Sequence, residues 1–228
     1  MPPAAAPRAH AGTLRLLQYI EHFRRHINMV NGGQNQKSSG DSLSNAQWSN
    51  FVQEFFMPSA MMRLKVRKMQ GISSTEGNDS PDTKPELKSF DLPFSVLPRY
   101  HHTWCNSEVS SITMSTPGAH ESVYHTSGPS NTAIRGPNGE VLPTTMTTIA
   151  THLVQAPRAM IVYTFLNGTS IRMIGHLRAA LTTSLPTPPN MSPQPLKFET
   201  LEFDVENCIE SIDRSSIVYK NVDKVQSG

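Results

Sequence analysis

Cysteine and charged residues are scarce in this chain of 228 residues. The two cysteines, Cys105 and Cys208, lie far apart and form no C-x-x-C motif, so we expect reduced thiols in an intracellular protein and no disulfide framework. Only 17% of the residues are charged, and the formal net charge is +2. The positive electrostatic potential that attracts nucleic acid is therefore not expected, and neither is direct binding to nucleic acid.

Long apolar runs and the common catalytic signatures are also missing. No apolar stretch approaches the ~18–20 residues that cross a bilayer, so the sequence predicts no membrane partner. There is no G-x-S-x-G elbow, no P-loop and no G-x-G-x-x-G motif to hold a nucleophile or a phosphate. The expected strands carry threonine, methionine and aliphatic residues rather than aspartate or glutamate. These absences predict a protein that is not an enzyme, with no catalytic residues and no cofactor.

One cluster, His101, His102 and Cys105, has side chains that could bind a metal ion. A structural zinc site needs four ligands in a tetrahedral array, and no second pair of ligands lies nearby in the sequence. We therefore predict no metal site, and expect one packed and one exposed histidine on a short helix.

What the chain does contain is a strongly apolar helix signal within residues 44–68. Ser44 and Gln47 have the spacing of a capping box, and Pro58 cannot continue a helix. Between them, apolar residues recur at i, i+3, i+4, i+7 and i+8 and form one helical stripe, which is the predicted core: Trp48, Phe51, Val52, Phe55 and Phe56. Beyond Pro58, apolar and basic residues alternate over 62–67, which predicts a half-buried strand.

The basic residues of this strand, Arg63, Lys65, Arg67 and Lys68, are the only basic run in the sequence. Such a run could contact DNA phosphates or contribute to a nuclear import signal. It is also typical of the solvated face of a strand, where lysines discourage pairing between sheet edges. We favour the solvated face.

The remaining periodicities predict an α+β domain. An apolar seam predicts a helix from about Thr13, as N-cap, to Val30, and Pro98 begins a short third helix. Asn167-Gly168 predicts a type I′ hairpin turn. Three early helices followed by many strands predict a curved antiparallel sheet with helices on one face. The expected strands are at 60–69, 90–92, 108–115, around Val123, 144–155, 158–166, 169–178 and 196–205.

The strand at 158–166 is apolar on both faces, because one alternating set ends in Phe165 and the other contains Met160 and Val162. Three helices cover only one face of a sheet, so we expect a second copy of the chain to cover the other. The sequence does not show which set faces the helices. The residues assigned to the dimer interface are Ala159, Ile161, Tyr163, Phe165, Ile171 and Met173.

Three segments resemble one protein family in their order and spacing. Residues 48–60 read W-x-x-F-V-x-E-F-F-x-P-x-A, residues 96–100 read V-L-P-R-Y, and residues 200–214 read T-L-E-F-D-V-E-N-C-I-E-S-I-D-R. They are similar to the dimerisation domain of LIM-domain-binding proteins, and the resemblance covers about residues 14–215. Asp213 departs from the family pattern, which has a proline before the final arginine.

The resemblance implies a cone similar to nuclear transport factor two and ketosteroid isomerase. It also implies a non-enzymatic transcriptional co-regulator scaffold in the nucleus, which forms a homodimer and bridges DNA-bound factors and a co-regulator with a LisH domain. The family's LIM-binding and LisH-binding segments lie C-terminal of this domain, so neither is assigned to residues of this chain. The long insertions resemble those of fungal members, which include a regulator of adhesion and development.

The expected organisation is a disordered tail at 1–12, a dimerisation domain at 13–215 with insertions at 70–88 and 182–195, and a linker or the start of a partner-binding region at 216–228. The alternative from another class is a small cone-fold enzyme with a buried isomerase-like pocket. A pocket in which a tyrosine or histidine faces a carboxylate would favour that alternative. A solid hydrophobic cone would count against it.

Overall fold

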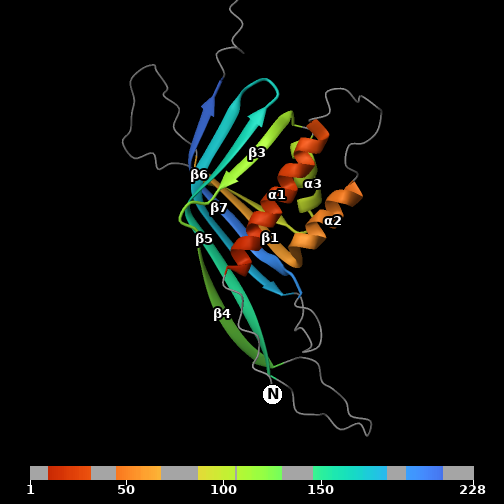
Figure 1. Cartoon of the computed structure of the whole chain (residues 1–228), viewed down its shortest axis with the longest axis vertical. Coiled ribbons are helices and arrows are strands. Elements are labelled where there is room, and N and C mark those ends of the chain that lie inside the picture. The colour runs from red at the N-terminus through yellow and green to blue at the C-terminus, as the bar shows by residue number, and fades with distance from the viewer. Residues whose placement is uncertain are drawn as a thin grey trace, which may run out of the picture.

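Three helices and seven strands make up the part of the chain that the structure describes (Figure 1). The computed structural model describes residues 10–31, 45–67, 87–105, 107–129, 146–183 and 194–212. None of its helices is long and apolar enough to cross a membrane. In chain order the elements are α1 (Ala11–Asn31), α2 (Asn45–Phe55), β1 (Phe56–Arg67), β2 (Leu87–Pro93), α3 (Leu97–Cys105), β3 (Val109–Ser115), β4 (His120–Pro129), β5 (Met146–Phe165), β6 (Ser170–Thr183) and β7 (Leu196–Ser211).

The strands form one curved sheet in the order β2-β1-β7-β6-β5-β3, and β4 also pairs with β5. Every pair is antiparallel except β1 and β7, which run parallel. The predicted α+β cone with three helices in its first half is confirmed, with one parallel pair in the sheet. Parallel strands need a long connection, and here most of the domain lies between Met62 and its partner Leu201.

All three helices lie on one face of the sheet, which we call the inner face (Figure 1). Tyr19 of α1 lies at the centre of the aromatic core, with its ring centroid 5.7 Å from that of Phe51 and 5.4 Å from that of Phe198 on β7. Each residue of the predicted aromatic stripe is buried here, at 0–4% exposure: Trp48, Phe51, Val52, Phe55 and Phe56.

The junction between α2 and β1 differs from the prediction that Pro58 ends the helix. The helix ends at Phe55, and the strand begins at Phe56, whose backbone pairs with Phe198 of β7. The register of this pairing then shifts between Phe56 and Met61, and Pro58 lies exposed within that irregular stretch. Proline cannot donate a ladder hydrogen bond, so a sheet accommodates it at such an irregularity.

β5 is one strand of 20 residues, where the sequence predicts two strands. The register with β6 shifts between Ala156 and Ala159, which places Pro157 and Arg158 in a bulge. On the same side of β5, the residues before the bulge therefore pair with β4 and those after it pair with β3. The hairpin of β4 and the first half of β5 extends beyond the helices (Figure 1).

The hairpin between β5 and β6 is present, but its turn is not the predicted type I′. Among Asn167 and Gly168 only the glycine has a positive φ, of 80°. The Gly168 N–H donates to the Phe165 carbonyl at 3.1 Å, and the Phe165 N–H donates to the Thr169 carbonyl at 2.8 Å. This is a three-residue loop with glycine in the left-handed position. Asn167 instead accepts a hydrogen bond from the Thr169 N–H through its side-chain oxygen, at 2.9 Å.

Several predicted features lie outside the described residues. They are Ser44 of the capping box, Lys68 of the basic run, most of both insertions, most of the N-terminal tail, and all of 216–228. At the edges of the predicted insertions, Leu87 and Lys88 begin β2, and Thr182 and Thr183 end β6.

Candidate functional site

The residues assigned to a dimer interface lie on the inner face of the sheet. Ala159, Ile161 and Tyr163 are 0%, 8% and 6% exposed and belong to the core of a single chain. The rest of the assigned set shares this face, because side chains alternate along a strand and directly paired residues lie on the same side: Phe165 of β5, and Ile171 and Met173 of β6. A second copy cannot reach the three buried residues. For these three residues the assignment is therefore corrected, while the place of the partly accessible Phe165, Ile171 and Met173 in an interface stays a prediction. The other set of β5 residues faces outwards.

No described helix covers the opposite face of the sheet, which we call the outer face (Figure 1). This face carries an apolar patch. Met160 of β5 pairs directly with Ile174 of β6. Two residues further along β5, Val162 pairs with Arg172 of β6. Arg172 pairs in turn with Ile209 of β7, so these side chains share one face. The three apolar residues of β5 and β6 are partly accessible in the single chain, and Ile209 is 39% exposed. We call Met160, Val162, Ile174 and Ile209 the outer patch.

Beside the outer patch, the outer face carries charged side chains, and some of them form ion pairs with each other. Arg178 of β6 lies opposite Glu202 of β7, and Glu202 forms an ion pair with Lys65 of β1. Nε2 of His176 lies 3.4 Å from Oε1 of Glu206. A basic row on β6 thus runs next to an acidic row on β7.

Two cations of the basic strand, Arg63 and Lys65, are held by carboxylates of the same chain. Nε of Arg63 donates to Oδ1 of Asp91 on β2 at 2.8 Å, and Lys65 pairs with Glu202. The hydrogen bond from Arg63 lowers the pKa of Asp91 below its ordinary value. A DNA phosphate would have to displace these carboxylates, which favours the interpretation of this run as a solvated strand face.

His101, one of the candidate metal ligands, is a buried structural residue. Its Nδ1 lies 2.7 Å from the Leu97 carbonyl oxygen, and its Nε2 lies 2.9 Å from the Tyr19 hydroxyl. Because a carbonyl only accepts, Nδ1 carries the proton and the Tyr19 hydroxyl donates to Nε2. Burial lowers the pKa of His101 to about 4, so the ring is neutral at pH 7. His102 is half-buried rather than exposed, and the described residues contain no group of three or more potential ligands that could hold a metal ion.

A buried carboxylate that the sequence analysis missed anchors the start of α1. Glu121 of β4 accepts hydrogen bonds from the backbone N–H groups of Gly12 and Thr13 at 3.0 and 2.9 Å, and from the Thr13 hydroxyl at 2.9 Å. Its Oε1 also lies 2.6 Å from Nδ1 of His152 on β5, and the two side chains are 2% and 6% exposed. Glu121 therefore caps a helix for which the sequence predicts Thr13 as the cap.

The groups around Glu121 explain why its carboxylate is charged and why residue 12 is a glycine. Burial alone would raise its pKa, but the hydrogen bonds from His152, Thr13 and Gly12 outweigh that effect and leave the pKa lowered. A Cβ at Gly12 would lie 3.0 Å from the Cβ of His152, so glycine permits this close approach. The signal available in the sequence is a histidine and a glutamate on half-buried strands. Because Glu121 and Gly12 are 109 residues apart, the sequence does not show that they meet.

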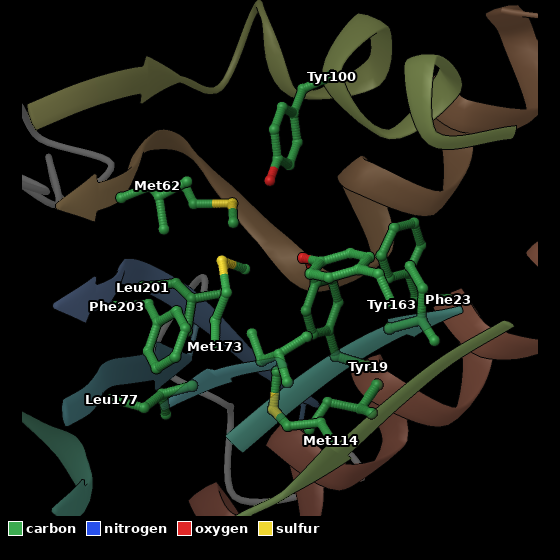
Figure 2. A pocket seen from close by; sticks show the side chains of 14 residues that line it. Tyr19, Phe23, Met62, Tyr100, Met114, Tyr163, Met173, Leu177, Leu201 and Phe203 are labelled. Atoms are coloured by element: carbon green, nitrogen blue, oxygen red, sulfur yellow. The ribbon is translucent and has the colours of Figure 1, made fainter. Parts of the chain in front are cut away.

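A cavity of about 50 Å³ lies between the helices and the inner face (Figure 2). Among the described residues, its lining contains no carboxylate, no histidine and no other charged side chain. The polar groups among its 14 lining residues are tyrosine hydroxyls. The lining therefore supplies no general base, and the arrangement that would favour an isomerase-like enzyme is not found in this cavity. The tyrosines are Tyr19, Tyr100 and Tyr163, and the lining methionines are Met62, Met114 and Met173.

Several solved structures are similar to this chain at low sequence identity. Naphthalene 1,2-dioxygenase with indole bound in its active site matches with a TM-score of 0.42 and 7% identity, over 87% of this chain and 79% of that one. The Mex67:Mtr2 subunits of Chaetomium match with a TM-score of 0.40 and 9% identity, over 73% and 94%. ActVI-ORFA of Streptomyces coelicolor matches with a TM-score of 0.30 and 6% identity, over 85% and 96%. At this distance none of them assigns a function to the chain.

The family comparison is more informative than these structural matches. A search of curated proteins found no match. The model of the LIM-domain binding protein family, in contrast, matches residues 14–227. That range contains the aromatic helix, all seven strands and the C-terminal segment that carries the resemblance. The chain therefore belongs to the LIM-domain binding protein family.

Proposed function

We propose that this chain is a homodimerising scaffold of a transcriptional co-regulator, in which two copies join through the outer faces of their sheets. Membership of the LIM-domain binding protein family supports a function in binding other proteins. The observation that carries the dimer is the outer patch, because Met160, Val162 and Ile174 stay accessible on a face without a described helix. An uncovered apolar patch on a sheet is typical of a protein interface.

The charges beside the outer patch suit a two-fold axis. In such a dimer the same surface of each copy meets its equivalent, so every basic group needs an acidic group on the same surface. Two crossing sheets would set the basic row of one copy against the acidic row of the other, which favours one orientation. The basic row is Arg172, His176 and Arg178, and the acidic row is Glu202, Asp204 and Glu206.

In this function the domain acts in the nucleus and holds together two sets of partners through segments that flank it. Those partners are DNA-bound factors and a co-regulator with a LisH domain. The domain itself does not bind DNA, because Arg63 and Lys65 are already paired with Asp91 and Glu202. It is a scaffold rather than an enzyme, since the lining of its inner cavity offers no base.

Adjacent residues of β5 test the dimer directly. Val162→Asp places a charge on the outer patch, and we expect a folded monomer by light scattering and circular dichroism. Ile161→Asp places the same charge in the core, where the side chain is 8% exposed, and should unfold the domain. Asn50→Asp, on an exposed position of α2 away from the outer face, is the control and should remain a folded dimer. A wild-type monomer, or a Val162→Asp variant that stays dimeric, would refute the proposed interface.

A further inference from the structure

The inner cavity lies on the other side of the sheet from the outer patch, and its lining combines apolar walls with directed hydroxyl groups. Tyr100 reaches over the space from α3, and its hydroxyl points into it (Figure 2). Met62 and Met173 flank the same space, with their sulfur atoms turned toward each other (Figure 2). The cavity is thus not lined by hydrocarbon alone.

The tyrosine hydroxyls differ in what they can offer to a ligand. The Tyr19 proton is directed at Nε2 of His101, 2.9 Å away, so toward the cavity Tyr19 can only accept. Tyr163 is 6% exposed, and no hydrogen bond of its hydroxyl is found within the described part of the chain. Burial and then the neighbouring Tyr100 and Tyr19 raise the pKa of Tyr163, so its hydroxyl keeps the proton and remains a donor.

The hydroxyl oxygen of Tyr163 is not among the fully buried atoms that lack a partner, so it keeps some accessible surface where the residue lines the cavity. Phenylalanine at position 163 would keep the stack on Trp104, whose ring centroid is 4.4 Å away. The Tyr163 hydroxyl therefore has no packing role that requires it. It lines the cavity as a donor without an acceptor.

The size and charge of the cavity limit what an acceptor can be. A charged molecule would be buried here without a counter-charge, because no lining side chain is ionised. At about 50 Å³ the cavity holds only a few heavy atoms, against the ~150 Å³ cavity that takes benzene. Methionine is unbranched and flexible, so a rotation of Met62, Met114 or Met173 can enlarge the space.

We propose that this cavity binds a small uncharged molecule that has an apolar body and one carbonyl oxygen, which accepts a hydrogen bond from Tyr163 or Tyr100. A compact cyclic ketone represents the class. The site binds its ligand without transforming it, because the lining holds no base or nucleophilic carboxylate. It would give the scaffold a ligand-binding site that is separate from its dimer interface.

Three probes of similar size test the proposal on the full chain: cyclohexanone, methylcyclohexane and cyclohexanecarboxylate. With ¹³C-methyl-labelled methionine, cyclohexanone should shift the methyl signals of Met62, Met114 and Met173, and leave that of Met160 on the outer face unchanged. Methylcyclohexane should bind more weakly because it offers no acceptor. Cyclohexanecarboxylate should not bind.

The Tyr163→Phe variant keeps the ring and removes the hydroxyl. We expect its affinity for cyclohexanone to fall by about 5–10-fold, the effect of one neutral hydrogen bond, with the affinity for methylcyclohexane unchanged. Tyr100→Phe provides a second test if Tyr163→Phe does not fold, and Tyr124→Phe, at a position 57% exposed and outside the cavity, is the control. The proposal is overturned if no inner methyl signal moves. It is equally overturned if cyclohexanone and methylcyclohexane bind alike and neither tyrosine variant changes their ratio.

Discussion

The inner and outer faces of the sheet are both apolar where β5 crosses them, yet they are stabilised differently. On the inner face even a charged side chain finds its hydrogen-bond and ring partners within the same chain. Arg15 is 9% exposed, its Nε donates to the Leu196 carbonyl at 2.9 Å, and its guanidinium lies 4.1 Å over the Phe55 ring. On the outer face Met160 and Val162 have no such cover among the described elements. Apolar composition alone therefore does not separate a core from an interface.

The largest expected difference between the faces comes from the aromatic core. Phe55→Ala should lower the free energy of unfolding by about 3–5 kcal/mol, because a fully buried aromatic ring is replaced by a cavity. Phe90→Ala on β2, where the side chain is 50% exposed, is the control and should change it far less. Urea unfolding of both variants makes the comparison. Equal losses would show that the inner face is not the core.

A second effect on the inner side depends on pH. The folded chain keeps His101 neutral down to a pKa of about 4, while the unfolded chain binds a proton at the ordinary value of 6.5. The contribution of the neutral His101 to the free energy of unfolding is therefore fully present above pH 6.5 and is lost as the pH drops toward 4. The loss amounts to roughly 3 kcal/mol for a pKa difference of 2.5 units. His101→Gln, which keeps an acceptor for Tyr19, should flatten this part of the profile.

The control for this profile is His125→Gln, because His125 is exposed on β4. It should leave the slope between pH 6.5 and 4 as it is in the wild type. An unchanged slope in His101→Gln would show that the buried imidazole is not responsible.

A smaller effect is expected where Glu121 anchors α1. Glu121→Gln removes the charge from an acceptor of several hydrogen bonds and should lower the free energy of unfolding at pH 7 by about 1–2 kcal/mol. Because its pKa is lowered, the stabilisation is present above the ordinary value of 4.5 and is lost as the pH falls through the folded value. Hydrogen exchange at the Gly12 and Thr13 amides should speed up in the variant. If Glu199→Gln, on an exposed position of β7, has the same effect, the capping role is wrong.

The smallest effect is expected at the edge of the outer face. Asp91→Asn breaks the exposed ion pair with Arg63, and should not change the melting temperature measurably, because such pairs contribute little in water. The double variant with Arg63→Gln should behave in the same way. A drop as large as that of Glu121→Gln would mean that charge pairs hold the outer face together.

Local patterns predicted much of this fold, and non-local contacts account for what they missed. The buried stripe from Trp48 to Phe55 follows from helical periodicity, because steps of three and four residues return to the same face of a helix. The orientation of residues 158–166 could not be predicted, since both alternating sets are apolar. The anchor formed by Glu121 and His152 joins three distant elements, so no sequence window contains it. The parallel pairing of β1 with β7 could not be predicted either, because the two strands are far apart in the sequence.

That parallel pairing has a consequence for synthesis on the ribosome. Met62 meets Leu201, and the core around Tyr19 includes Phe198, so the sheet cannot close until the final strand has left the exit tunnel. Until then the aromatic faces of α1 and α2 lack their contacts with β7, and a nascent chain in this state is prone to aggregate or to be held by chaperones. Any truncation before β7 therefore leaves the first half of the chain without the strand that completes it.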